Sequence, residues 1–285
     1  MNRNIIVALI VIVALIGGAY FYLNSQSRNK TPEHGGGHPT QTSNQPVVQS
    51  HRSYQIEVTS DTSNIRPNQP TAFTYKIKND KGEILKNYEI AHEKIMHFII
   101  VVRKDLQQFQ HIHPDFNQST GEFSVAVTFP TDGPYRVFPD FTPGVENPQK
   151  LPVTVFHDIA VGDVSKYKAQ AVTTDAQSKK TFDGYQVTHN LPGNLNKQQE
   201  VNYSLNIERN SQPVTDLQTY LGALGHSVIL KEETLDFIHT HAGESGTGPK
   251  IEFSTTFPES GMYKIFTQFQ HQNKIITTDY VIKVN

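Results

Sequence analysis

The chain has 285 residues, of which 36% are hydrophobic, and its formal net charge is −2. This length accommodates one or two domains of about 100–200 residues each. The balanced charge gives no basic face for nucleic acid. The absence of cysteine excludes disulfides, thiolate-bound metals and iron–sulfur clusters. The composition is unusual in having thirteen histidines but only three methionines.

Residues 1–23 are predicted to form a membrane anchor. Arg3 precedes the apolar run IIVALIVIVALIGGAYFYL, and Tyr20 and Tyr22 stand near its outer end, where interfacial aromatic residues belong. As a helix the run would be about 28 Å long, close to the thickness of a bilayer's hydrocarbon core. We therefore expect a single-pass protein of the cell membrane whose C-terminal domains are extracytoplasmic. A cleaved signal peptide is the alternative, although no Ala-x-Ala site follows the run.

Residues 24–52 are predicted to be a disordered tether. They are rich in Gly, Pro, Asn, Gln and Ser and lack the apolar side chains that would offset the entropy of ordering. His34, His38 and His51 lie in this segment. Histidine-rich tracts can bind metals weakly, but a polar linker that happens to contain histidines is an equally good interpretation.

From residue 53 the pattern becomes one of short alternating segments separated by turns, such as Tyr54–Val58 and Phe123–Phe129. Alternation with a period of two and frequent turns is typical of a β-sandwich or barrel. The sequence predicts an all-β protein with two tandem immunoglobulin-like or cupredoxin-like β-sandwich domains. Domain 1 is expected at 53–160, a polar linker at 161–181 and domain 2 at 182–285.

The two predicted domains are internal repeats. Each contains a strand that begins with histidine, then an Asp/Leu pair, a Phe-x-His-x-His segment, a Phe-Pro pair and a Gly-x-Tyr-x-x-Phe strand. The recurring histidines are His97, His111 and His113 in domain 1, and His226, His239 and His241 in domain 2. Their recurrence indicates common descent of the halves. Tyr135 and Tyr263 are expected to be buried, as in a tyrosine corner.

This pattern resembles the YtkA-like group of bacterial extracytoplasmic β-sandwich domains, which are often associated with heavy metals. The resemblance covers about residues 85–145 and, more weakly, 215–282. It implies an immunoglobulin-like or cupredoxin-like sandwich outside the cytoplasm. Domain 2 departs from the motif, because Ala242 stands where domain 1 has Pro114 and Gly225 where it has Met96.

The histidine spacing favours a metal site. On a strand, residues i and i+2 point to the same face, so His111 and His113 direct both imidazoles to one side. The thirteen residues from Phe98 to Gln110 suit a hairpin with its turn near Arg103–Asp105, which would bring His97 beside them. Three imidazoles leave an open coordination position, as in catalytic zinc or exchangeable copper sites.

The candidate ligands fall into two ranks. The two histidine trios come first, and Met96, His92 and Asp140 are second-rank candidates in domain 1. His271 and Gln268 are weaker candidates in domain 2. Met96 could favour Cu(I), but it neighbours His97 and so faces the opposite side of a regular strand. Nitrogen ligands without thiolate favour copper, as Cu(II) or Cu(I), with zinc as the alternative.

The expected function is that of a membrane-anchored extracytoplasmic metal-binding protein, acting as a copper chaperone, buffer or sensor with a metal-delivery protein as partner. The alternative is a non-catalytic adhesion or assembly module with structural histidines. Blue-copper electron transfer is disfavoured because it requires a Cys thiolate. A third candidate is a hydrolase that uses a zinc-bound water and therefore needs a nearby general base. Glu93 and Asp115 could serve as that base, but neither lies in a His-Glu-x-x-His arrangement, and the sequence has no nucleophile elbow, phosphate loop or dinucleotide fingerprint. We therefore expect no enzyme activity.

Overall fold

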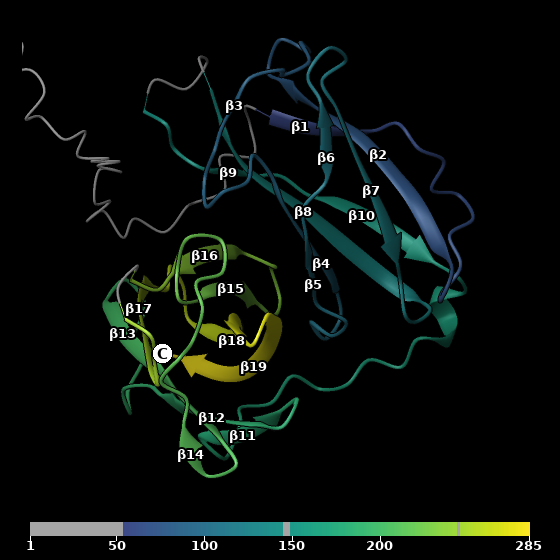
Figure 1. The fold of residues 1–285 in the computed structure, drawn as a ribbon. Helices are drawn as coiled ribbons and strands as arrows, with labels where there is room; N and C mark the ends of the chain where they lie inside the picture. Colours follow the sequence, from purple (N-terminus) through teal and green to yellow (C-terminus); the bar gives the residue numbers. More distant parts are fainter. Residues whose placement is uncertain (1–53, 145–148, 244–245) are drawn as a thin grey trace, which may run out of the picture. The chain divides into compact units, whose positions relative to one another are not determined.

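The computed structural model describes residues 54–144, 149–243 and 246–285 (Figure 1). Within these residues it contains nineteen strands and one short 3-10 helix, η1 (Val164–Lys166). The predicted all-β fold of two repeated sandwich domains is confirmed. The predicted anchor and tether lie outside the described residues. Among the residues described, no helix has the length and apolar character needed to cross a membrane.

Domain 1 consists of two sheets in which all neighbouring strands are antiparallel. The first sheet has the order β1-β2-β7-β6, with β1 (Tyr54–Val58), β2 (Pro70–Asn79), β7 (Glu122–Thr128) and β6 (Asp115–Asn117). The second has the order β10-β8-β4-β5, with β10 (His157–Val161), β8 (Gly133–Pro143), β4 (His97–Val102) and β5 (Gln110–Ile112). Two short strands, β3 (Tyr88–Glu89) and β9 (Val153–Thr154), also pair with β8.

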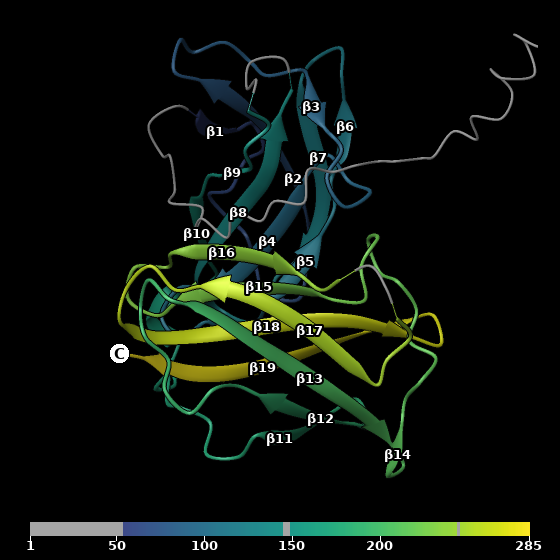
Figure 2. The same ribbon diagram turned by 90° about the vertical axis from the view of Figure 1, so that its left-hand side faces the viewer.

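Domain 2 repeats this plan (Figure 2). Its first sheet has the order β11-β12-β13-β14, with β11 (Lys179–Phe182), β12 (Tyr185–Asn190), β13 (Glu200–Arg209) and β14 (Gln212–Pro213), and β17 (Lys250–Thr256) also pairs with β13. Its second sheet has the order β16-β15-β18-β19, with β16 (Phe237–His241), β15 (His226–Lys231), β18 (Gly261–His271) and β19 (Lys274–Val284). The hairpin β15–β16 corresponds to β4–β5 of domain 1, and β18 corresponds to β8.

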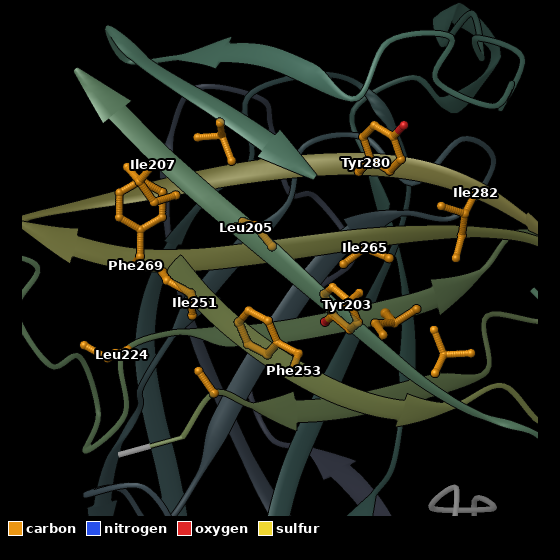
Figure 3. Packing of buried hydrophobic residues seen from close by; sticks show 14 of the residues in the cluster. Tyr203, Leu205, Ile207, Leu224, Ile251, Phe253, Ile265, Phe269, Tyr280 and Ile282 are labelled. Atoms are coloured by element: carbon orange, nitrogen blue, oxygen red, sulfur yellow. The ribbon is translucent and has the colours of Figure 1, made fainter. Parts of the chain in front are cut away.

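Each domain buries an apolar core between its two sheets. In domain 2, Leu205 and Ile207 of β13 and Phe253 of β17 belong to one cluster with Ile265 and Phe269 of β18 (Figure 3). These side chains come from alternate positions of their strands, as period-two alternation requires. In domain 1 the core includes stacked aromatic rings, such as those of Tyr75 and Phe98, whose centroids are 5.2 Å apart.

The tyrosine of each Gly-x-Tyr strand is fully buried, as expected from the sequence. The hydroxyl of Tyr135 donates to the carbonyl oxygen of Thr131 at 3.2 Å, and that of Tyr263 donates to the carbonyl oxygen of Glu259 at 2.9 Å. Both bonds reach back four residues, to the turn that precedes the strand. The repeated contact shows that the two halves share corner geometry as well as sequence.

The predicted linker is held by specific contacts. The side chain of Asp105, at the turn of the β4–β5 hairpin, accepts hydrogen bonds from the Tyr167 hydroxyl at 2.8 Å and the Gln170 backbone amide at 2.9 Å. The strand β11 begins at Lys179, inside the segment expected to be linker, because residues 179–182 pair with β12. The connection is therefore shorter than residues 161–181.

The outer faces of the two histidine-bearing sheets pack on each other. Both sandwiches belong to one compact unit. An apolar cluster joins β4 and β8 of domain 1 to β15, β16 and β18 of domain 2. Its buried members are Ile99, Val101, Leu106, Phe138, Val228, Leu230, Leu235, Phe237 and Phe266. The rings of Phe109 and Phe266 stack across this contact, 4.3 Å apart and 9° from parallel. We call this set the interdomain cluster.

Substitution of Phe266 by alanine should uncouple the two domains. Loss of a buried phenylalanine costs about 3–5 kcal/mol, and here the lost contacts join the domains. Urea unfolding should change from one transition to two. Phe253→Ala, in the core of domain 2, is the matched control and should lower the midpoint without dividing the transition. A single, unbroken transition in the Phe266→Ala protein would show that the interdomain cluster does not couple the domains.

Candidate metal centre

The hairpin β4–β5 assembles the first histidine trio as its spacing predicts. The strands pair with Ile99 opposite His111, and the turn follows Val102. His97 Nδ1 lies 3.0 Å from His111 Nε2 and 3.3 Å from His113 Nε2. One nitrogen from each ring lies within 4.8 Å of the other two, which is compact enough to hold one ion. We call His97, His111 and His113 the first trio.

The second trio differs from the prediction. The hairpin β15–β16 places His226 opposite His241 and Val228 opposite His239. The compact group is formed by His226, His241 and His92, with one nitrogen of each within 4.8 Å of the others. The sequence pattern instead predicts His226 with His239 and His241. His92 belongs to domain 1, so the candidate ligands of this second trio come from both domains. The sequence repeat compares positions within each domain and therefore could not predict this grouping.

His92 stands on a tight turn that presents it to domain 2. The backbone groups of Ala91 and Lys94 bond each other, and the two central residues, His92 and Glu93, have φ angles of 49° and 63°. Non-glycine residues rarely adopt this left-handed region, and such strain is concentrated at functional sites. The His92 ring stacks on that of His241 with centroids 3.5 Å apart. The equivalent residue in domain 2 is Leu221, so only one domain carries this histidine.

Two hydrogen bonds cross between the domains in a symmetric manner. His239 Nδ1 lies 2.8 Å from Asp140 Oδ2, and His111 Nδ1 lies 2.7 Å from Gln268 Oε1. Asp140 pairs with His97 in register and Gln268 pairs with His226, so they occupy equivalent positions. Each domain thus orients the first His-x-His imidazole of the other. Asp140, predicted as a candidate ligand, binds a histidine instead, and its second oxygen accepts from the Thr154 hydroxyl.

Backbone carbonyls orient the remaining central rings. His97 Nε2 lies 3.2 Å from the carbonyl oxygen of Ala91, and His226 Nε2 lies 2.8 Å from that of Tyr220. Because a carbonyl oxygen can only accept, the proton of each neutral ring is on Nε2, and Nδ1 carries the lone pair. Ligating histidines in proteins almost always donate their other N–H to a carboxylate or carbonyl in this way.

The free nitrogens converge in the buried cluster. By the same reasoning the ring proton of His111 faces Gln268, so its Nε2 and His97 Nδ1 present two lone pairs to each other at 3.0 Å. That contact is repulsive unless a cation lies between them. Three further buried nitrogens have no hydrogen-bond partner among the described residues: His226 Nδ1, His239 Nε2 and His241 Nε2. Each orphaned polar group costs about 1–3 kcal/mol in a dry interior.

Burial disfavours the charged form of five imidazoles in the cluster. It lowers the pKa of His97 to about 3 and that of His226 to about 2. Burial, with the charge of Lys94, lowers the pKa of His113 to about 4. The pKa values of His111 and His241 lie well below their usual range for the same first reason, burial. A shared proton is therefore disfavoured, and neutral imidazole is the form that binds metals.

Two other predicted candidates lie elsewhere. Met96 is 1% exposed and packs in the apolar core of domain 1, because it points to the opposite face of the strand from His97. His271 lies 2.8 Å from the Tyr185 hydroxyl and 3.0 Å from an Asp216 carboxylate oxygen, within domain 2. The structure therefore restricts the centre to seven histidines of the described chain: His92, His97, His111, His113, His226, His239 and His241.

Solved structures share only a distant likeness with the chain. Salmonella alpha-2-macroglobulin reacted with methylamine is 9% identical, with 83% of this chain and 15% of that chain covered and a TM-score of 0.27. A chimeric titin Z1Z2 is 9% identical (82% and 98% covered, TM-score 0.23). A Corynebacterium diphtheriae protein described as membrane anchored is 12% identical (81% and 57% covered, TM-score 0.23). The chain spans less than a sixth of the macroglobulin's length, and such scores carry no functional argument.

No curated protein matches the chain. A family model does match it twice, at residues 49–157 and 179–285, which together make up most of the sequence. The two matches establish tandem copies of one domain, as the internal repeat predicts, but they do not establish the YtkA-like identity. The chain belongs to the family described as Domain of unknown function (DUF8832), in two copies.

Proposed function

We propose that this protein binds transition-metal ions, copper foremost, through the histidine cluster between its two domains. It acts as a copper chaperone, buffer or sensor, held at the outer side of a membrane by residues 1–23 and receiving metal from a delivery protein. The observation that supports the proposal best is the orientation of the buried imidazoles. His97 and His226 donate Nε2–H to carbonyls, and His111 and His239 turn Nδ1 to side-chain oxygens. Their other nitrogens either face each other, as in His97 and His111, or have no partner among the described residues, as in His226 and His239.

The donor set favours copper over other metals. All ligating atoms are imidazole nitrogens, and the chain has no cysteine. Sites of this kind bind Cu(II) most tightly among divalent first-row ions, with Zn(II) next in relevance. The neutral rings need not lose a proton to bind, so binding persists below the usual histidine pKa.

The alternative of structural histidines in an adhesion module fits less well. Structural histidines satisfy their ring nitrogens with hydrogen bonds, whereas His226 does so through Nε2 alone. His226 Nδ1, His239 Nε2 and His241 Nε2 remain buried and unsatisfied by any described residue. A purely structural role gives no reason to gather so many unsatisfied groups in one place.

Calorimetric titration of the full-length chain with Cu(II) and Zn(II) tests the proposal. Copper should bind with a dissociation constant below about 1 μM. To remove the contribution of the tether, His34, His38 and His51 are replaced by alanine in every sample. The double variant His111→Ala/His113→Ala should lose the tight site of the first trio, since two of its three ligands are gone.

His157→Ala, which removes a histidine outside the cluster, is the matched control and should bind as the parent does. Copper binding that is equally weak in the parent and in the double variant would contradict the proposal. In that case the tethered interaction module with structural histidines would be the better description.

Removal of the Asp140 charge should weaken metal binding without loss of a ligand. The Asp140 carboxylate accepts a hydrogen bond from His239 Nδ1 and so orients the His239 ring. Substitutions of such oriented partners typically lower metal affinity by about 10–100-fold. Asp140→Asn should show a loss of that size in competition with a chromogenic chelator, whereas Asp115→Asn, at an exposed position of β6, should show none. Unchanged affinity in Asp140→Asn would exclude this role for the carboxylate.

The metal-free protein should lose stability as the pH falls below about 6.5. The unfolded chain protonates its histidines near that value, whereas burial keeps His97, His226 and His113 neutral to about pH 3, 2 and 4. Between these limits the unfolded state binds more protons, so the free energy of unfolding falls with decreasing pH, by up to about 1.4 kcal/mol per pH unit for each histidine.

Urea denaturation with a chelator at pH 7.5, 6.5, 5.5 and 4.5 (roughly the window set by those pKa values) measures this dependence. His113→Gln should reduce the slope, because one protonating group is removed. If the free energy of unfolding at the two lowest pH values equals that at the two highest, these imidazoles are not held neutral in the folded protein.

A further inference from the structure

We infer that the cluster binds two metal ions at the same time, as a closely spaced pair that bridges the two domains. This inference rests on the proposed function and concerns the number and spacing of the ions.

The number of histidines exceeds what one ion can use. The first trio and the second trio share no residue, and in each the three nitrogens lie within 4.8 Å of one another. Zinc and copper sites in proteins hold about three or four imidazoles around one ion. Two ions with three imidazoles each use six of the seven rings, and His239 remains for the open position of either ion.

The two trios are direct neighbours. Within the first trio the ring centroids of His97 and His113 are 5.1 Å apart, and within the second those of His226 and His241 are 4.7 Å apart. Between the trios, the centroids of His97 and His92 are 6.2 Å apart and those of His97 and His226 are 6.4 Å apart. The longest distance within a trio, between His92 and His226, is 5.3 Å, so rings of the two trios are nearly as close to each other as rings of one trio.

His239 lies where the trios meet. Its ring centroid is 5.3 Å from that of His97 in the first trio, and 4.5 Å from that of His241 in the second. Its side chain is 9% exposed, and Nε2 has no partner among the described residues. An ion held at about 2 Å from the nitrogens of either trio would therefore have an imidazole of the other trio as a neighbour.

The charges around the cluster favour an anion between the ions. Asp140 is the acidic side chain that bonds a ring of the cluster, whereas two divalent ions bring four positive charges. Three imidazoles leave each ion an open position that water can occupy, and a bound metal lowers the pKa of that water strongly. A hydroxide or a similarly small anion shared by the two ions would lower their repulsion and couple their unpaired electrons.

Copper content and electron paramagnetic resonance of the same samples test the inference. The full-length chain, with His34, His38 and His51 replaced by alanine, is titrated with Cu(II) and desalted. We expect two ions per chain. At full loading the integrated spin should fall well below the copper content, or a half-field transition should appear, because the two spins interact. His113→Ala and His241→Ala should each bind one ion and give an uncoupled signal of full intensity. His157→Ala should keep the coupled pair.

Each outcome has a distinct meaning. Two coupled ions support the inference. One ion per chain, or two ions whose spin equals the copper content without a half-field transition, overturns the pair while the metal-binding function stands. If the parent retains no more copper than a protein surface without histidines would, both the ion pair and the metal-binding function are overturned. The measurement on the parent decides between these outcomes even if a variant fails to fold.

Discussion

The structure depends on buried imidazole nitrogens that face one another without protons. At 3.0 Å, His97 Nδ1 and His111 Nε2 are within hydrogen-bond distance, yet the other nitrogen of each ring already faces an oxygen acceptor. Protonation of one ring would relieve the repulsion, but burial lowers the pKa of both. A metal cation between the two nitrogens would relieve it without that penalty, which is the electrostatic basis of the proposed metal site.

The repeat explains both the symmetry of this arrangement and its exception. Duplication of one domain placed Asp140 and Gln268 at equivalent positions, and each orients a histidine of the opposite domain. The domains have diverged at the turn that precedes the first histidine strand, where domain 1 has His92 and domain 2 has Leu221. The two trios are consequently unequal: the first comes from domain 1 alone, and the second joins both domains.

The sequence predicted the sandwiches and the first trio because both depend on local pattern. Period-two alternation specifies the strands, and the His97–His113 spacing specifies the hairpin. The second trio depends on how the domains dock, which no spacing within a repeat encodes. One signal of docking is nevertheless present. All six residues of β4, His97–Val102, are buried, and HFIIVV shows no alternation. Such a continuous apolar run in an antiparallel sheet indicates that both faces are covered, here by the partner domain.

The proposed metal binding would be thermodynamically linked to the docking of the two domains. The apolar contacts of the interdomain cluster and the hydrogen bonds His239–Asp140 and His111–Gln268 join the domains, while the unsatisfied nitrogens beside them oppose docking in the metal-free protein. A ligand that binds the docked form and not the separated domains stabilises docking by mass action. The contacts between the domains thus set the positions of the candidate ligands, and a metal bound as proposed would offset the free-energy cost of the unsatisfied imidazoles. Under that proposal, metal occupancy would change the strength of the contact between the domains.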